Sequence, residues 1–545
     1  MRRTPLALVI AVIIVVAAAG TAIATSSTDS QANQPQVAGD RTSNTTARFP
    51  TNKQNEPTVA IAPDGKHAIA GSNDEQKQPK CGPGTLRGAT ALGSNCSFFP
   101  GVGTSGVYVS GDTGGSWTNL GLLPGYTDTG SAVAKSAGPL ATSAAPGTLI
   151  SDGDAVVVYG PKLINGKFTF ARGARAYYAN LAAYASSATQ GNQAPELLAV
   201  SISDDNGTSW HDPVLAVTAS GYVFNDKEDI WADRNPSSPN FGRVYLSWTQ
   251  FRSGPGTAEP VMFAYSTDAG LTWSAPNQLT AAYNNASRGG RQGSLIRTGP
   301  SGEVYVIIED GDNQLGSQQV VLVSLDGGLT FSKKISISKV SDIADPIPGA
   351  NFRTDSFASA GVDQTTGAVY VAWSDAKSGS GLITVAKSTD QGQTWPTVTT
   401  ASTPNEGYAF FQGLDVAPNG RIDVGYQALK AKTAIYGTGN ASVDSYYVSS
   451  IDGGLTWSGP LKVSTVPSDP AASAQTNLAR QFWGDYSTVA STDATALFIY
   501  TDARSGVGCK AVDDYQHGTA AKPAPGTDCP KQFGNTDLYV SKITP

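Results

Sequence analysis

The feature that most constrains this chain is an eight-residue pattern that occurs six times. The copies are SGDTGGSW (110–117), SDDNGTSW (203–210), STDAGLTW (266–273), SLDGGLTF (324–331), STDQGQTW (388–395) and SIDGGLTW (450–457). Successive copies start about 60 residues apart, with one longer interval between the first two. A fixed period of this length indicates that one supersecondary unit is used repeatedly.

Each repeat unit predicts four short β-strands. The fourth unit shows the order clearly, with GSLIRTG, EVYVIIED and QQVVLVS before its eight-residue pattern and FSKKISIS after it. The second strand is the most regular, as in HAIAGS, RVYLSW, EVYVII, AVYVAW and RIDVGY, and no helical period competes with it. Each unit therefore predicts a four-stranded antiparallel sheet.

Four-stranded sheets repeated around an axis form an all-β β-propeller, in which neighbouring blades bury each other's faces. One further unit lacks the eight-residue pattern and consists of DYSTVAS (485–491), ALFIYTD (496–502) and DLYVSKI (537–543). Its fourth strand is expected from the segment before Glu56, which would close the ring by joining the two ends. This count predicts seven blades, with six as the alternative.

The repeated pattern has the chemistry of a rigid hairpin corner. Its Ser and Asp side chains can bond the backbone of a tight turn, its Gly supplies a positive φ, and its aromatic residue starts the outer strand. Six copies around a ring cannot all face one site. We therefore expect the repeated Asp to be structural rather than catalytic.

The N-terminal sequence predicts export. Two arginines precede a long apolar run that ends in Ala22-Ile23-Ala24, so residues 1–24 are expected to be a signal peptide, with an uncleaved membrane anchor as the alternative. Residues 25–47 are rich in Ser, Thr, Asn and Gln and predict a flexible segment. Residues 48–545 are expected to form a single propeller domain, secreted or held at the cell surface.

Composition excludes several classes of protein. Charged residues make up 15% of the chain and the net charge is -7, so nucleic acid is not an expected partner. An exported chain with four cysteines favours two disulfides, and the simplest pairing is Cys81 with Cys96 and Cys509 with Cys529. The cysteine spacing is unlike that of a zinc site, and no cofactor is expected. Calcium held by loop carboxylates and carbonyls is left open, although no EF-hand-like spacing marks a site. We expect a monomer.

The pattern S-x-D-x-G-x-T-W, repeated at this spacing, resembles the Asp box of the sialidase (neuraminidase) superfamily. The resemblance covers residues 56–543 and implies the propeller fold, with a terminal sialic acid or related acidic sugar as the substrate. Asp boxes also occur in endoglycanases, sorting receptors and photosystem assembly factors, so the fold alone does not define the function.

The resemblance implies specific catalytic residues. Sialidases use a Tyr nucleophile, a Glu partner and an Asp acid/base, because a neutral Tyr avoids the repulsion that a carboxylate would meet from an anionic sugar. Tyr486 in Tyr486-Ser487-Thr488-Val489 matches the nucleophile motif. Glu228 is the expected partner and Asp74 the expected acid/base.

Sialidases also grip the substrate carboxylate with three arginines, which bind it through paired hydrogen bonds. The family's first arginine lies in an Arg-Ile-Pro motif, but here the equivalent residues are Asn55-Glu56-Pro57. Arg48-Phe49-Pro50 fits the triplet, but no strand follows it directly. Arg291, Arg353 and Arg480, at the starts of inner strands, are the expected replacements.

Two other functions remain open from the residues. A non-catalytic propeller could bind glycans or proteins through aromatic residues near the axis, namely Trp231, Tyr408, Trp483 and Tyr486. An endoglycanase would need two carboxylates that face each other across a cleft. The inner strands offer four candidates for that pair, Asp154, Asp229, Asp355 and Asp485.

Overall fold

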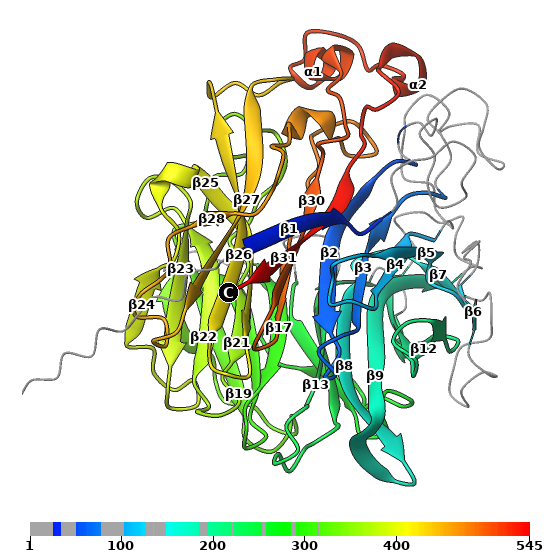
Figure 1. Ribbon diagram of the computed structural model, residues 1–545, viewed down its shortest axis with the longest axis vertical. Helices are drawn as coiled ribbons and strands as arrows, with labels where there is room; N and C mark the ends of the chain where they lie inside the picture. The colour runs from blue at the N-terminus through cyan, green and yellow to red at the C-terminus, as the bar shows by residue number, and fades with distance from the viewer. Residues whose placement is uncertain are drawn as a thin grey trace, which may run out of the picture.

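The computed structural model describes residues 26–33, 49, 51–77, 103–126, 134–135, 149–184, 195–219, 223–252, 258–284, 290–312 and 316–545. In this part of the chain, seven antiparallel sheets surround a common axis (Figure 1). The innermost strands contact one another in the cyclic order β2, β8, β13, β17, β21, β25 and β29, and β29 contacts β2 again. The prediction of a seven-bladed all-β propeller is confirmed.

The blades follow one another along the chain. Blade 1 contains β2 (Gln54–Ile61), β3 (Ala68–Asp74), β4 (Ser105–Ser110) and β5 (Thr118–Leu122). Blade 2 contains β7 (Leu149–Ser151), β8 (Val156–Ile164), β9 (Lys167–Tyr184), β10 (Leu197–Ser203) and β12 (Val214–Val217). Blade 3 contains β13 (Val223–Ala232), β14 (Val244–Arg252), β15 (Val261–Ser266) and β16 (Asn277–Gln278). A short parallel pair joins β6 (Ala134–Lys135) to β11 (Ser209–Trp210).

The later blades are the most regular. Blade 4 contains β17 (Arg291–Thr298), β18 (Val304–Asp312), β19 (Gly316–Ser324) and β20 (Ile335–Lys339). Blade 5 contains β21 (Ser359–Val362), β22 (Val369–Asp375), β23 (Leu382–Ser388) and β24 (Thr397–Thr400). Blade 6 contains β25 (Tyr408–Val416), β26 (Ile422–Ala431), β27 (Ala441–Ser450) and β28 (Leu461–Lys462). Blade 7 contains β29 (Thr488–Ser491), β30 (Ala496–Asp502), β31 (Asp537–Thr544) and β1 (Ser26–Gln31).

The ring closes through strands from both ends of the chain. β1 pairs antiparallel with β31 as the outermost strand of blade 7, and the two lie side by side in Figure 1. The prediction that a segment before Glu56 supplies this strand is confirmed. The interpretation of residues 25–47 as a flexible segment does not hold for residues 26–33, because Asp29 forms an ion pair with Arg504 at 2.9 Å and Asn33 is buried against Asp537.

Each Asp box forms the corner between the third and fourth strands of blades 1 to 6, as predicted. In blade 4, the Ser324 hydroxyl donates to Asp326 and accepts from the backbone N–H of Gly328. The Asp326 carboxylate also accepts from the backbone and hydroxyl of Thr330. The same set of hydrogen bonds occurs at the other boxes. The repeated Asp carboxylate therefore stabilises its own turn.

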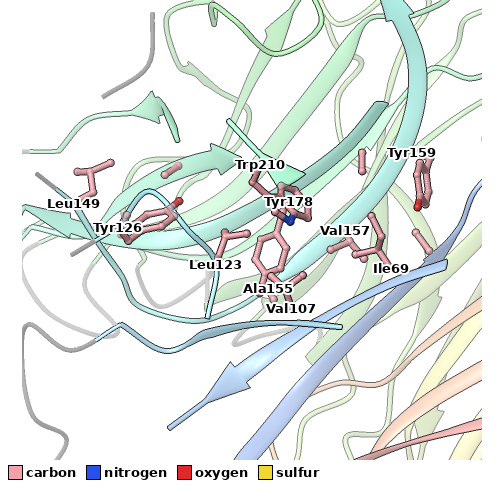
Figure 2. Close-up of a cluster of buried hydrophobic side chains, with 14 of the residues drawn as sticks. Ile69, Val107, Leu123, Tyr126, Leu149, Ala155, Val157, Tyr159, Tyr178 and Trp210 are labelled. Atoms are coloured by element: carbon pink, nitrogen blue, oxygen red, sulfur yellow. The ribbon is translucent and has the colours of Figure 1, made fainter. Parts of the chain in front are cut away.

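Neighbouring blades bury each other's faces. Figure 2 shows one such cluster, where Tyr178 and Trp210 of blade 2 lie close to Val107 and Ile69 of blade 1. The rings of Tyr178 and Trp210 meet edge to face with their centroids 6.0 Å apart. Apolar contact across the blade interface therefore supplies the core that a single blade lacks.

A helical insertion interrupts blade 7 between β30 and β31. It contains α1 (Lys510–Gln516) and α2 (Pro525–Asp528), and the disulfide Cys509–Cys529 closes it as predicted. The predicted signal peptide, residues 1–24, and the predicted pair Cys81–Cys96 lie outside the described residues. The described residues also include two 3-10 turns, Pro404–Glu406 and Pro470–Ala472. The described residues include no helix that is long and apolar enough to cross a membrane.

Candidate active site

The inner strands turn single-copy side chains toward the axis at their upper ends, where each strand begins. β2, β13, β17 and β25 each carry a register shift near this end. Within each shift one residue has a left-handed backbone: Glu56 (φ 54°), Lys227 (φ 54°), Gly293 (φ 62°) or Phe411 (φ 47°). The inner strand of blade 2 is likewise broken between β7 and β8, at Asp154 (φ 53°). Such bulges re-aim side chains and occur frequently beside active sites.

Six charged residues meet where these bulges converge. This axial cluster consists of Glu56, Asp154, Asp226, Lys227, Arg353 and Asp485. Arg353 donates two parallel hydrogen bonds to Asp485, from Nε to Oδ1 at 2.6 Å and from an Nη to Oδ2 at 2.5 Å. The same guanidinium lies 3.6 Å from Glu56, and the Lys227 ammonium lies 3.9 Å from Asp485. Four carboxyl groups therefore share two cations.

The cluster divides its carboxyl groups into two kinds. Burial alone would raise the pKa of Asp485, but the charges of Lys227 and Arg353 outweigh it and hold the pKa below its ordinary value. Burial raises the pKa of Glu56 well above its ordinary value and that of Asp154 to about 7, and the neighbouring carboxylates add to both shifts. The surroundings thus favour the ionised form of Asp485 and the protonated form of Glu56.

An upper cavity of about 130 Å³ lies just inside the cluster. Its charged lining residues are Lys227, Glu228, Asp229, Arg297, Asp355 and Asp485, and Tyr486 and Phe357 also line it. Asp355 precedes β21 in blade 5 and Asp485 precedes β29 in blade 7, so the two carboxyl groups reach the cavity from different blades. Desolvation raises the pKa of Asp355 to about 6, against the lowering effect of the Ser356 N–H that it accepts at 2.8 Å.

Tyr486 and Glu228 both lie at this cavity. The Lys227 ammonium sits 3.9 Å from the centroid of the Tyr486 ring, and among the described residues the phenolic oxygen has no hydrogen-bond partner. Burial, followed by the charge of Asp154, raises the pKa of Tyr486 well above its ordinary value. Burial and the charge of Asp154 also raise the pKa of Glu228, whose carboxyl oxygens have no hydrogen-bond partner in the described part of the chain. The phenol therefore stays protonated, and Glu228 does not bond it.

The three predicted arginines do not converge. Arg353 belongs to the axial cluster. Arg480 instead pairs with Asp345 at 2.5 Å and donates to the backbone oxygen of Asn351. Arg291 is fully buried away from the axis, where it donates to the side chain of Asn284 and to backbone oxygens of residues 259 and 281.

The other predicted residues lie apart from the upper cavity. Asp74 is fully buried in blade 1, where it accepts from Gln54, Gln76 and Tyr108, and burial raises its pKa to about 6. Trp483 is buried against Phe352 and donates to Gln427. Trp231 is near the end of β13, and its indole N–H donates to Thr298 at the end of β17.

Sequence reasoning missed Glu56, Asp226 and Lys227 as members of the axial cluster. The sequence held one signal for Glu56, because Asn55-Glu56-Pro57 places a carboxylate where the Arg-Ile-Pro motif of sialidases has an arginine. The sequence around Lys227 does not indicate a bulge, because the residue with the left-handed backbone is a lysine and not a glycine. Of the four carboxylates proposed for a shared cleft, Asp229, Asp355 and Asp485 line one cavity, whereas Asp154 does not line it and interacts with Glu56 and Asp226.

Together, the seven blades and the Asp-box corners define a seven-bladed Asp-box β-propeller. No protein-family model and no curated protein sequence matches the chain.

Solved structures match the fold at low identity. A Hadza microbial sialidase has 16% identity and a TM-score of 0.39, over 63% of this chain and 62% of that one. An α-L-arabinanase of Penicillium chrysogenum has 13% identity and a TM-score of 0.42, over 70% and 90%. An α-L-arabinofuranosidase of Fusarium graminearum has 10% identity and a TM-score of 0.41, over 96% and 98%. These likenesses concern the fold alone.

Proposed function

We propose that this protein is a glycoside hydrolase that cleaves a neutral sugar at the upper cavity, with Asp355 as general acid and Asp485 as the ionised carboxylate. The observation that carries the proposal is that these two groups line one cavity while their surroundings push their pKa values apart. Glycosidases use such a pair, one carboxyl group to protonate the leaving oxygen and one carboxylate to assist at the sugar carbon.

The geometry suits each role. Asp355 is exposed at the cavity, so its proton can reach a glycosidic oxygen, and its pKa of about 6 keeps it protonated under mildly acidic conditions. Asp485 is held by two hydrogen bonds from Arg353, which fix its position and its charge. It would stabilise the positive charge that develops on the sugar ring or orient the attacking water.

The charge balance favours a neutral substrate. An acidic sugar needs free guanidinium donors, but Arg353 directs two of its N–H groups at Asp485. Arg297, the other guanidinium at the cavity, donates to Asp229 and to backbone oxygens. The remaining cluster cation, Lys227, covers the Tyr486 ring, and its charge acts on Glu56, Asp154 and Asp226 as well. A second anion entering this site would meet repulsion. Tyr486 is better placed as an aromatic wall of the cavity than as a nucleophile, because its pKa is raised.

We also propose that the protein acts outside the cytoplasm. The N-terminal sequence supports export, and the Cys509–Cys529 disulfide supports an oxidising compartment.

The test is hydrolysis of a panel of 4-nitrophenyl glycosides that contains neutral pyranosides, neutral furanosides and a sialoside. Turnover of a neutral glycoside is expected. Asp355→Asn should lower kcat by about 100-fold or more, the usual contribution of a general acid. The loss should be much smaller on a dinitrophenyl glycoside, because that leaving group needs no proton. Activity of the parent enzyme should fall as the pH rises above about 6, where Asp355 loses its proton.

Asp345→Asn is the matched control, because Asp345 is an arginine-paired carboxylate that does not line the cavity. It should keep full activity. Turnover of the sialoside that is abolished by Tyr486→Phe would overturn the proposal in favour of the tyrosine route. Glycan binding without turnover of any substrate would instead identify a non-catalytic propeller.

A further inference from the structure

A second cavity opens at the opposite, lower end of the axis. Its volume is about 680 Å³, well within the range of small-molecule sites. The turns between the first and second strands of several blades form its rim, including exposed residues at 63–65, 236, 364, 418 and 493–494. Deeper in the cavity lie Trp231, Arg234 and Asp415.

Arg234 is the unusual group in this lower cavity. Its guanidinium stacks on the Trp231 ring at 4.5 Å from the centroid. Within the described residues its other interactions are electrostatic and include no hydrogen bond or close ion pair, although a guanidinium carries five N–H donors. Arg243 and Arg297, which also lie near this end of the ring, both donate to backbone oxygens. A partly buried guanidinium with unused donors facing a cavity is suited to receive an acceptor from a ligand.

The charged groups around Arg234 already form hydrogen bonds with other partners. Asp415 is the carboxylate that acts on it most strongly, but the two oxygens of Asp415 accept the backbone N–H groups of Val416 and Ser491. Arg297 bonds Asp229 and two backbone oxygens. Burial and the neighbouring Arg297 lower the pKa of Arg234, which an anion in the cavity would reverse.

We infer that the lower cavity binds a small monoanionic carboxylate through Arg234. A carboxylate matches the planar fork of a guanidinium with two parallel hydrogen bonds. The carboxylates of Asp64, Asp415 and Asp493, which also line the cavity, disfavour a ligand with more negative charge. The body of the ligand would pack on the apolar part of the lining, which consists of Ile61, Pro63, Phe170, Pro236, Val416 and Pro418.

This site is separate from the proposed active site. Asp229 and Arg297 lie between them, since both residues line the upper cavity and the narrow middle part of the channel. Asp355 and Asp485 do not line the lower cavity. The inference at Arg234 therefore does not rest on the proposed hydrolase residues, although Arg234 also lines the middle part of the channel.

The probe for this site is benzoate, with benzamide as its uncharged match. We expect the full-length protein to bind benzoate saturably, with an affinity in the millimolar range or better by calorimetry or ligand-observed NMR. Benzamide should bind much more weakly. Arg234→Gln should weaken benzoate binding about tenfold or more, the typical effect of losing a charged hydrogen bond. Arg234→Lys keeps the positive charge but loses the two parallel donors, so its affinity for benzoate should lie between those of the parent and of Arg234→Gln.

Two controls make the test decisive. Lys430→Gln removes an exposed positive charge elsewhere on the ring and should bind benzoate like the parent. Asp355→Asn, which alters the upper cavity, should also bind it normally. The inference is overturned if the parent protein shows no saturable benzoate binding. It is equally overturned if folded Arg234→Gln and Arg234→Lys both bind like the parent, or if Asp355→Asn abolishes binding.

Discussion

The buried ion pair of blade 6 gives the sharpest stability test of the ring. The Arg421 and Asp423 side chains are 5% and 0% exposed, and their two hydrogen bonds measure 2.7 and 2.9 Å. Arg421 also donates to the backbone oxygens of Thr492 and Asp493, in the turn between β29 and β30. One side chain thus joins blade 6 to blade 7.

Arg421→Met should destabilise the protein by about 3–5 kcal/mol, because it leaves the Asp423 carboxylate buried with only a tyrosine donor. The double variant Arg421→Met/Asp423→Leu removes both charges. It should recover much of this loss, with a coupling energy of about 2 kcal/mol or more between the two sites. Lys462→Met is the control, because Lys462 is 43% exposed in its 2.8 Å pair with Asp444 and should contribute about 0–1 kcal/mol.

The measurement is reversible urea unfolding, followed by tryptophan fluorescence after refolding has been verified for each variant. The reasoning is refuted if Arg421→Met costs no more than Lys462→Met. It is also refuted if the double variant shows the simple sum of the two single losses. Either result would mean that burial does not increase the contribution of the Arg421–Asp423 pair to the free energy of unfolding.

Two further predictions concern the corner of an Asp box and the disulfide. Asp326→Ala should destabilise the protein by about 1–2 kcal/mol, since it removes four hydrogen bonds from an exposed turn, and Asp326→Asn should cost less. These bonds hold the folded pKa of Asp326 at about 2, below its unfolded value. Its contribution is therefore present above about pH 4 and is lost as the pH falls toward 2, so acid unfolding of Asp326→Asn should be less steep. Replacing Cys509 and Cys529 with serine should loosen the helical loop that the disulfide closes, whose cysteines are 20 residues apart, by about 3 kcal/mol, seen as faster amide exchange there with the propeller unchanged. Unchanged exchange would show that packing alone holds the insertion.

The repeat was sufficient to predict the fold. The Asp box fixes both the corner of a blade and its position in the sequence, because it needs a Ser, an Asp and a positive-φ Gly at fixed offsets. The strands of blade 4 consequently appear where the pattern placed them. The position of β1 was harder to predict, because a short polar segment such as SSTDSQ becomes a strand only when β31 offers its free edge.

The site was predictable only in part, because its contacts are long-range. Tyr486, Glu228 and Arg353 were placed near the axis by their position at the start of inner strands, and the structure places them there. Arg291 occupies an equivalent position in the sequence but turns into the blade interior, where Asn284 and backbone oxygens satisfy it. No local pattern distinguishes these two outcomes. The 132-residue separation of Arg353 from Asp485 lies equally beyond any motif.

The division between repeated and unrepeated residues explains how such a propeller can acquire a site at each end. The Asp boxes lie at the lower corners of the blades, where their carboxylates are occupied by their own turns. The upper ends of the inner strands carry no repeated turn, so a bulge there can turn a residue such as Glu56 or Lys227 toward the axis without disturbing the corner. At the lower end, the first turns of the blades form a rim around the axis, and Arg234 lies inside it. Variation in either ring of loops therefore changes the chemistry at one end of the channel and leaves the frame intact.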